Sequence, residues 1–453
     1  MPYEGEFAGY RSLQRVAETE RVQLLLRKAR VLPKSDAPRS PPPMAPVAPP
    51  NLPDFVVAID GSLAEVSVEN GFPGARVGYC TVASVLLDLG LMAELDEQRP
   101  ADPREFRKTE QSATIDAAFP GSNVVTRTNT SARDSFRETL YEVFHDEVPD
   151  EQDRQPLLST YEALLALKPT TRDGQQCPYQ PDGCDRHLAQ IRPSITSCEC
   201  PKRRPIYSTD ALRVYERFRD LGSNMEAIGE VMQVWERVLL VHLLRCFERK
   251  GWIDREDKVG RLAFIVDGPL AVFGHPAWIS TAITKELKRL NSLYRAKTGK
   301  DLLILGVEKT GEFVTHFEHV DQTQLAGEEH FPKRSYQLLT DCYIKERIKF
   351  SESEKRYGAD TYFGRKLFYK TASGARIVAT IPFLTDEQDT LDSDDIALYP
   401  QFAAACALLD KLVSSRYPNS LSPLVSANAQ AAIPLNLGAR VLEQLARALM
   451  GRG

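Results

Sequence analysis

The chain has 453 residues, of which 42% are hydrophobic and 26% charged, which is ordinary for a globular protein of one large domain or two to three smaller ones. The net charge of -5 excludes a global basic field for nucleic acid, and no apolar run approaches the ~20 residues that span a membrane. The acidic N-terminus lacks the apolar core of a secretory signal, and eight cysteines are too few for a disulfide scaffold. We therefore expect a reduced, cytoplasmic protein without a membrane partner.

The first 53 residues are predicted to precede the main domain. Residues 10–31 have the pattern of an amphipathic helix, so we assign residues 1–32 to an N-terminal helical segment. The apolar side of this helix would carry Leu13, Val16, Val22, Leu25 and Leu26. Residues 33–53 are crowded with proline, which predicts an extended linker.

Two apolar runs far apart in the chain end in the same way. Residues 55–60 and 262–267 are typical of strands buried on both faces, and they end in Asp60-Gly61 and Asp267-Gly268. We expect each acid to lie where its strand leaves the sheet, so that the two carboxylates converge at one sheet edge. Paired carboxylates in that position suit a divalent metal ion.

Two other interpretations of these aspartates stay open. Asp-Gly is a common turn pair, so each acid could simply stabilise a turn. Asp60-Gly61-Ser62 after a strand could also cradle a phosphate, as in sugar-kinase-like folds. The chain has no Gly-x-x-x-x-Gly-Lys-Ser/Thr loop, which argues against a P-loop ATPase.

The remaining patterns alternate between strands and helices. Further strands are expected at 64–68, 75–82, 302–307, 361–369 and 375–381. Helices are expected at 134–168, 209–250 with a break near Gly222, 279–297, 397–414, and from about Leu437 within a C-terminal segment 436–453. A meander that carries the first acid, then a helix, then a strand with the second acid predicts a mixed α/β fold: a ribonuclease H-like sheet flanked by helices.

A site for two metal ions needs a third acid. Glu236 lies in an otherwise apolar helical stretch, where a carboxylate is costly unless its charge is compensated. It could pair internally with Arg237, or it could face the sheet edge as a metal ligand. Glu230 on the same predicted helix is a rival for the second role.

Two further polar residues follow predicted elements. Lys309 comes after the strand 302–307, where it could hold a phosphate or stabilise developing charge, although a solvated lysine at a strand end is equally consistent. Asp341 precedes a short predicted helix and could be its N-cap rather than a site residue.

A cysteine-rich insertion is predicted at residues 170–205. Its sulfur atoms belong to Cys177, Cys184, Cys198 and Cys200, and His187 lies among them. Four such ligands suit tetrahedral zinc, and a metal could fold a loop that has little core of its own. The spacing is not that of the usual Cys-x2-Cys knuckles, so free thiols or a redox role are alternatives. A catalytic zinc is not expected, because four thiolates leave no open position.

Four short segments carry a resemblance to a known family. Asp60-Gly61-Ser62, Asp267-Gly268, Gly306-Val307-Glu308-Lys309 and Thr340-Asp341 together resemble the NurA nuclease family over residues 54–435. The resemblance implies a ribonuclease H-like nuclease that depends on manganese or magnesium and acts on DNA ends and single strands. It also implies a homodimer that works with the hexameric HerA ATPase translocase. The family's metal ligands would fall on Asp60, Glu236 and Asp267.

One position departs from the family pattern. The family carries Tyr-Pro near the C-terminus and then Ala-His, whereas this chain has Tyr417-Pro418 and then Ala427-Asn428. Asn428 could offer a carbonyl oxygen to a metal but could not transfer protons. Two hypotheses therefore remain: a metal-dependent deoxyribonuclease of DNA end processing or anti-phage defence, and a non-catalytic DNA- or translocase-binding subunit on the same fold.

Overall fold

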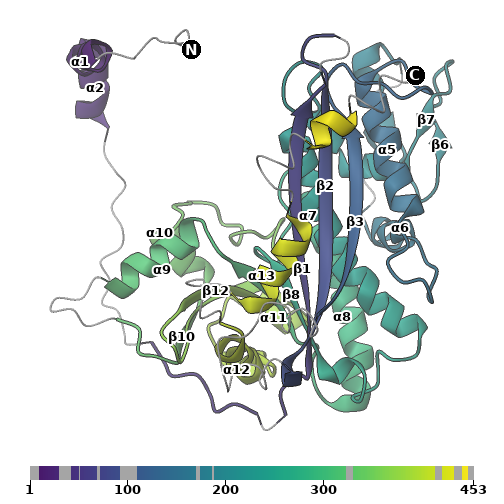
Figure 1. Cartoon of the computed structure of the whole chain (residues 1–453). Helices are drawn as coiled ribbons and strands as arrows, with labels where there is room; N and C mark the ends of the chain where they lie inside the picture. Colours follow the sequence, from purple (N-terminus) through teal and green to yellow (C-terminus); the bar gives the residue numbers. More distant parts are fainter. Residues whose placement is uncertain are drawn as a thin grey trace.

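The computed structural model describes residues 10–29, 42–49, 51–68, 72–91, 110–169, 174–185, 188–322, 330–413, 421–432 and 441–446. Its centre is an eight-stranded sheet in the order β10-β11-β12-β9-β8-β1-β2-β3, with helices on both faces (Figure 1). None of the helices in these ranges combines the length and the apolar character that crossing a bilayer requires.

The sheet is mixed. Its strands are β1 (Phe55–Ser67), β2 (Arg76–Asp88), β3 (Glu110–Pro120), β8 (Leu262–Asp267), β9 (Ile304–Glu308), β10 (Ser335–Leu338), β11 (Gly364–Lys370) and β12 (Arg376–Pro382). The first three form an antiparallel meander, β8 and β9 run parallel to β1, and β12, β11 and β10 continue from β9 as antiparallel neighbours. This order, with the meander before the parallel strands, confirms the mixed, ribonuclease H-like α/β prediction.

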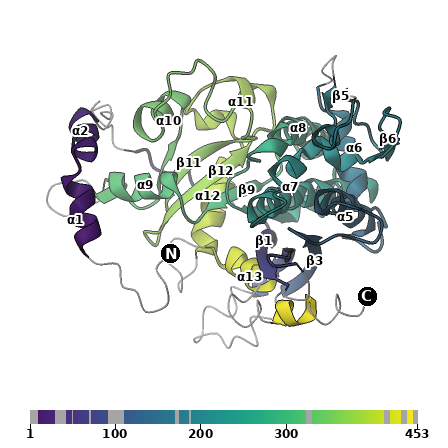
Figure 2. The same ribbon diagram turned by 90° about the horizontal axis from the view of Figure 1, so that it is seen from above.

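Helices cover the two faces of the sheet as separate groups (Figure 2). One face carries α5 (Ala132–Asp146), α6 (Leu157–Ala166), α7 (Met225–Arg249) and α8 (Ile279–Thr298), and the other carries α12 (Phe402–Leu412) and α13 (Ser422–Ala431). Side chains alternate along β1, as a strand requires. Val57 and Ile59 enter the core beneath α7, whereas Val56 and Ala58 enter the core beneath α12 and α13.

The remaining elements are short. They are α1 (Tyr10–Glu18), α2 (Glu20–Lys28), α9 (Glu312–Gln322), α10 (Asp341–Arg347), α11 (Asp386–Thr390) and the paired strands β4 (Gln175–Gln176) with β5 (Leu188–Ala189) and β6 (Thr196–Ser197) with β7 (Pro205–Ile206). Short 3-10 helices lie at Gln180–Asp182, Ser208–Leu212, Val214–Arg217, Val259–Arg261, His275–Trp278 and Ile396–Leu398.

The predicted end of the first strand is wrong. β1 does not stop at Asp60 but continues to Ser67, and it absorbs the separate strand expected at 64–68. The physical reason is that β2 pairs with β1 over its whole length, from Phe55 to Ser67, so the backbone beyond Asp60 keeps its hydrogen-bond partners. The prediction holds for Asp267, which ends β8.

Several segments that were predicted as single helices are divided into two or more helices in the structure. The helix expected at 10–31 is two helices, α1 and α2, and the apolar side chains of Leu13, Leu25 and Leu26 are exposed. The region 134–168 divides into α5 and α6, and 209–250 begins as two 3-10 helices before α7 starts beyond Gly222. Strand β3 was not predicted. Residues 441–446 are helical, which agrees with the helix predicted from about Leu437, whereas Leu437 itself, His187 and Tyr417-Pro418 lie outside the described residues.

Candidate active site

The site lies where β8 ends while its parallel neighbour β1 continues. Ile59 is paired with Val266, so the next residues, Asp60 and Asp267, lie side by side at this step. The chain leaves β9 beside them and carries Lys309, whose Nζ is 3.2 Å from Asp60 Oδ2 and 2.9 Å from Asp267 Oδ1. The expected convergence of the two aspartates is therefore present, with Lys309 between them.

Glu236 reaches the same place from α7, through space that a glycine leaves open. A Cβ atom on Gly61 would lie 2.6 Å from Glu236 Oε1 and 2.8 Å from Met232 Cγ. Because side chains alternate on the regularly paired β1, Asp60 points away from the α7 face while Gly61 points toward it. The Glu236 carboxylate thus rests against β1 directly beside Asp60, and a side chain at position 61 would displace it.

Arg237 compensates the charge of Glu236 and fixes the end of β8. Its Nη1 pairs with Glu236 Oε2, and its Nη2 donates to the carbonyl oxygens of Asp267 and Pro269, each at 2.9 Å. The turn that presents these carbonyls runs through Gly268, whose φ of +75° favours glycine. Both interpretations of Glu236 therefore apply: it pairs with Arg237 and it faces the aspartates.

Glu230, the rival third acid, lies in a different network. Its Oε1 is 3.1 Å from Arg217 Nε, and its Oε2 is 3.6 Å from His275 Nδ1. Glu236, in contrast, interacts electrostatically with both Asp60 and Asp267. The structure groups Glu236, rather than Glu230, with the two aspartates.

Burial makes these carboxyls hold protons more tightly than usual. Burial, followed by the charge of Asp267, raises the pKa of Asp60 to about 7, although Lys309 acts in the opposite direction. Burial also raises the pKa of Glu236 to about 7; Arg237 opposes this shift, and the charges of Asp60 and Asp267 add to it. Within the described part of the chain, the three carboxyl groups pair with two cations, Lys309 and Arg237, so the site favours an additional positive charge.

The donor set fits a hard divalent cation. Carboxylate oxygens are the ligands that Mg²⁺ and Mn²⁺ prefer, and the Lys309 ammonium lies between the two aspartates as a positive charge would. Among the described residues, the groups of three ligand atoms that lie within 4.8 Å of one another consist of cysteine sulfurs. The oxygens of Asp60, Glu236 and Asp267 are therefore farther apart than 4.8 Å as a set of three. Asp60, Glu236 and Asp267 could hold the ion after Lys309 moves aside.

Asn428 occupies an exposed position on a helix that covers the opposite face of the sheet from α7. It lies on α13, which packs on the sheet through Leu424 and Ala427, and its own side chain is exposed. In the part of the chain that the structure describes, the Asn428 side chain makes no hydrogen bond.

Asp341 is not the helix N-cap. Thr340 caps α10 by accepting a hydrogen bond from the Tyr343 backbone N–H, and Asp341 is the first helical residue. The Asp341 carboxylate pairs with Lys345 at 2.7 Å and accepts a hydrogen bond from the Tyr357 backbone. Those contacts identify it as a support of the α10 region.

Two features of the site were not recognised in the sequence. One is the close approach that Gly61 permits, for which the small residue after Asp60 was the available signal. The other is the second role of Arg237, which binds the carbonyls that follow β8 as well as Glu236. No sequence motif predicts a contact between an arginine in a helix and a turn about 30 residues later, because such a contact depends on tertiary packing.

The fold and the site define a mixed α/β protein with a buried carboxylate cluster suited to a divalent cation. The family model of the NurA domain matches residues 55–433. The chain therefore belongs to the NurA family.

Solved structures of NurA proteins are similar over most of the chain but at low identity. The crystal structure of the NurA nuclease from Sulfolobus solfataricus is 10% identical, with 90% of this chain and 88% of that chain covered and a TM-score of 0.35. A crystal structure of NurA is 12% identical, with 98% and 95% covered and a TM-score of 0.30. A crystal structure of NurA bound to dAMP and manganese is 11% identical, with 97% and 94% covered and a TM-score of 0.27. The comparison with curated proteins found no match.

Gly61→Ala should disrupt the site more than the fold. The added methyl group would overlap Glu236 Oε1 and Met232 Cγ, both on side chains that can move, so we expect Glu236 to be displaced. Calorimetric titration with Mn²⁺ should show at least about tenfold weaker binding, while thermal unfolding changes little. Gly229→Ala on the same helix as Glu236 controls for a general effect of replacing a glycine, because its added methyl group would meet only Leu63 Cδ2 at an ordinary 3.8 Å. Unchanged Mn²⁺ affinity in Gly61→Ala would contradict the placement of Glu236.

The raised pKa values predict how the stability of the metal-free protein depends on pH. The pKa values of Asp60 and Glu236 in the folded state, about 7, lie above their ordinary values, so the folded state binds more protons than the unfolded state from about pH 4 to about pH 7. Stability in EDTA should therefore fall as pH rises through this window.

Urea unfolding of the wild type and Asp60→Asn between about pH 5 and about pH 8 measures the contribution of Asp60. The free energy of unfolding of the wild type, minus that of the variant, should decrease as pH rises. A difference that is the same at every pH would show that the pKa of Asp60 is not raised.

Proposed function

We propose that this chain is a metal-dependent deoxyribonuclease that hydrolyses phosphodiester bonds. The observation that carries the proposal is the shared contact of Lys309 with Asp60 and Asp267, with Glu236 beside them. Membership of the NurA family supports the same chemistry. We infer Mn²⁺ or Mg²⁺ as the cofactor because all the candidate ligands are carboxylates.

Each residue of the cluster would have a distinct task. Asp60, Glu236 and Asp267 would hold the cation, which when bound would acidify a water molecule and neutralise phosphate charge. Lys309, once it leaves the aspartates, would contact a phosphate oxygen and stabilise developing negative charge. Arg237 keeps Glu236 and the end of β8 in place. Asn428 remains a predicted catalytic residue, limited to offering its amide oxygen.

A basic and aromatic pocket near the site supports a single-stranded substrate. It encloses about 410 Å³ between the segment after β8 and the segment before β11, and its lining includes Phe273, Tyr357, Tyr362, Lys349 and Lys355. Phe273 is 41% exposed and meets Tyr362 edge to face, with ring centroids 5.5 Å apart. An exposed aromatic ring with half-buried rings and lysines beside it suits a stacked base and its phosphate.

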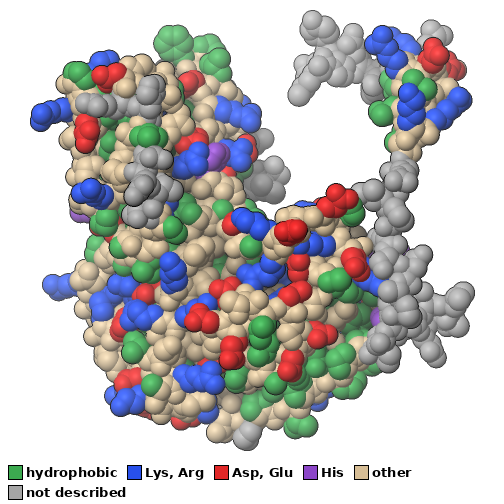
Figure 3. All heavy atoms as spheres, turned by 180° about the vertical axis from the view of Figure 1, so that it is seen from behind, with side chains coloured by type: hydrophobic (Ala, Val, Ile, Leu, Met, Phe, Trp, Pro, Cys, Tyr) green, Lys and Arg blue, Asp and Glu red, His purple; other side chains and the backbone are tan. Residues whose placement is uncertain are grey.

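The surface charge supports dependence on a partner. On the face seen in Figure 3, Lys and Arg are interspersed with Asp and Glu, and the net charge of the chain is -5. Such a surface attracts DNA weakly at physiological salt. We propose that a HerA-type hexameric ATPase delivers DNA to a homodimer of this chain, in DNA end processing or in defence against phage.

The second candidate is a non-catalytic subunit that binds DNA or the translocase. Asn428 favours it, because an amide replaces the histidine that the family pattern places there, and an amide cannot transfer protons. This candidate predicts binding of the same partners without cleavage.

Cleavage of linear DNA in Mn²⁺ distinguishes the two candidates. Wild type should cut, and more rapidly with a HerA-type ATPase and ATP, whereas Asp60→Asn should lose about 100-fold or more of the rate because a ligand is removed. Asp257→Asn, an exposed acid that pairs with Arg255 in the loop before β8, is the matched control and should cut normally. Equal rates for wild type and Asp60→Asn would refute the site, and DNA bound but uncut with ATPase and Mn²⁺ present would establish the second candidate.

Binding of a single-stranded oligonucleotide in EDTA tests the pocket without cleavage. Lys349 and Lys355 pair with the exposed acids Glu312 and Asp360, so both can exchange a carboxylate for a phosphate. Replacing both by alanine should weaken binding and lower the slope of log affinity against log salt by about 0.7 per lost phosphate contact. Lys300→Ala, another exposed and paired lysine, should leave both quantities unchanged. An unaltered slope in the double variant would exclude this pocket from the DNA path.

A further inference from the structure

Two small hairpins in the cysteine-rich insertion bring three sulfur atoms within 4.8 Å of one another and carry a fourth cysteine beside them. Cys177 directly follows β4 and Cys184 precedes β5, so the first hairpin contributes two thiols. Cys198 directly follows β6 and Cys200 lies in the turn before β7, so the second hairpin contributes two more. All four cysteines are at most 8% exposed.

The distances among three of the sulfurs match one face of a tetrahedron around a single ion. Cys177 Sγ is 3.6 Å from Cys198 Sγ and 3.9 Å from Cys184 Sγ, and the last two sulfurs are 3.5 Å apart. A Zn–S bond of about 2.3 Å implies tetrahedral edges of about 3.8 Å. A disulfide would need about 2.0 Å, so these thiols are not cross-linked. The fourth thiol, that of Cys200, lies outside this group of three but interacts electrostatically with the thiols of Cys198 and Cys184.

Backbone donors surround the sulfurs. The N–H groups of Tyr179, Cys200 and Lys202 interact with the thiols of Cys177, Cys198 and Cys200, in that order, although burial still raises the pKa values of the Cys177 and Cys198 thiols. Such donors stabilise negative charge on sulfur, and a thiolate is the form of cysteine that binds metal. Apart from the cysteines, Tyr179 and Ile206 are the fully buried apolar residues of this cluster, so the insertion has little core to hold it.

We propose that Cys177, Cys184, Cys198 and Cys200 bind one structural Zn²⁺, which closes the insertion and secures it on α5 through Arg137. Four thiolates complete the coordination, so the ion would have no open position for substrate. This site is independent of the carboxylate cluster, and the proposal does not rest on the nuclease assignment.

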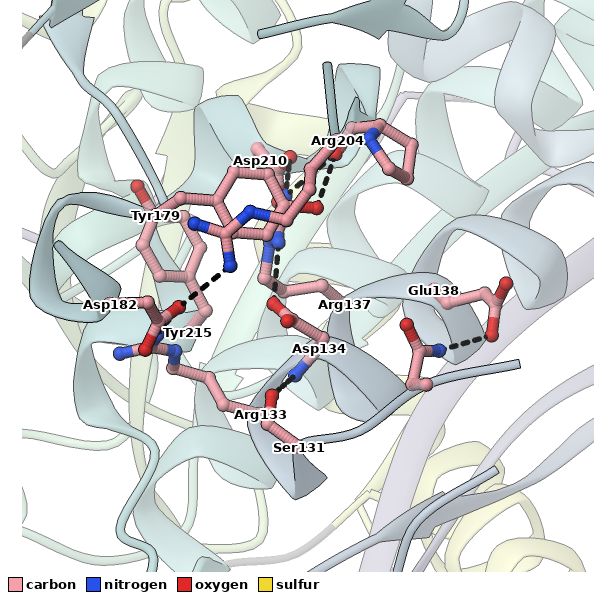
Figure 4. Close-up of polar contacts among 12 residues, drawn as sticks. Ser131, Arg133, Asp134, Arg137, Glu138, Tyr179, Asp182, Arg204, Asp210 and Tyr215 are labelled. Atoms are coloured by element: carbon pink, nitrogen blue, oxygen red, sulfur yellow. Dashed lines mark hydrogen bonds and ion pairs between the residues drawn. The ribbon is translucent and has the colours of Figure 1, made fainter. Parts of the chain in front are cut away.

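Arg137 connects the zinc-binding hairpins to the main domain. Its guanidinium is 1% exposed, donates to both oxygens of Asp210 at 2.8 and 2.7 Å, and donates to Asp134 at 2.8 Å (Figure 4). Two of its other neighbours belong to the hairpins: the Tyr179 ring, 4.4 Å from the guanidinium carbon, and the Pro205 carbonyl oxygen at 3.3 Å.

A second set of contacts holds the hairpins in the same place. Arg204 lies over the Tyr179 ring at 3.8 Å, and both Arg204 and Arg133 of α5 pair with Asp182 (Figure 4). Tyr179 is two residues from Cys177, and Arg204 is four residues from Cys200. Loss of the ion would therefore loosen residues that surround a buried cation, which is costly to leave without partners.

Metal analysis of the full-length chain, purified without added zinc, tests the proposal. We expect about one zinc ion per chain in wild type and in Asp60→Asn, and clearly less in Cys198→Ser. Cys342→Ser, an exposed cysteine outside the cluster, is the matched control and should retain the zinc. Removing zinc from wild type with a strong chelator should lower the unfolding temperature, and returning Zn²⁺ should restore it.

If Cys198→Ser fails to fold, a measurement on the wild type alone can still test the zinc site. Wild type refolded with Co²⁺ in place of zinc should show the visible absorption of a tetrahedral tetrathiolate centre. Zinc-free protein that is equally stable, iron in place of zinc, or Co²⁺ absorption without thiolate character would overturn the assignment.

Discussion

Carboxylates buried side by side repel one another, and the arrangement of this protein follows from how that repulsion is compensated. Lys309 bridges Asp60 and Asp267, and Arg237 pairs with Glu236 while also binding the carbonyls beyond Asp267. Removing one of these cations would leave buried charge unpaired, which costs far more than an exposed ion pair contributes. The same repulsion favours binding of a divalent cation, which would supply more positive charge than the single ammonium group of Lys309.

The sheet provides the geometry for this cluster through unequal strand lengths. β8 stops at Asp267, while β1 continues to Ser67 because β2 remains its partner. Asp60 therefore lies beside a strand end without itself being at one. Glu236 approaches from the opposite face of β1, through the space at Gly61, so carboxylates from both sides of the sheet meet around the end of β8. The carboxylate site therefore needs β1, β8 and the helix α7 together, and no single segment defines it.

The sequence was sufficient for those parts of the fold that local patterns determine. Continuous apolar runs located β8 to its exact residues and indicated β1, β9 and the β11–β12 hairpin, and their order led to the mixed sheet. The length of β1 could not be predicted, since it depends on how far β2 remains paired with it. Strand β3 was not predicted, because Glu110–Pro120 mixes polar and small residues without a strong alternation of apolar and polar side chains.

For the site, the two Asp-Gly pairs were visible in the sequence, although only Asp267 ends its strand, and the sequence did not decide the third acid. Glu230 and Glu236 lie on the same helix, and only the packing of α7 against Gly61 separates them. The cysteines show the same limit. Their spacing is unusual for zinc, yet two hairpins with hardly any core bring three of the sulfurs to tetrahedral distances. In both cases, tertiary packing contains the information that spacing lacks.

The most direct measurement is anomalous diffraction from crystals grown with Mn²⁺. The account predicts an anomalous peak bounded by Asp60, Glu236 and Asp267, with the Lys309 ammonium displaced from between the aspartates. A crystal saturated with Mn²⁺ in which Lys309 still bridges the aspartates, and no peak lies near them, would contradict it.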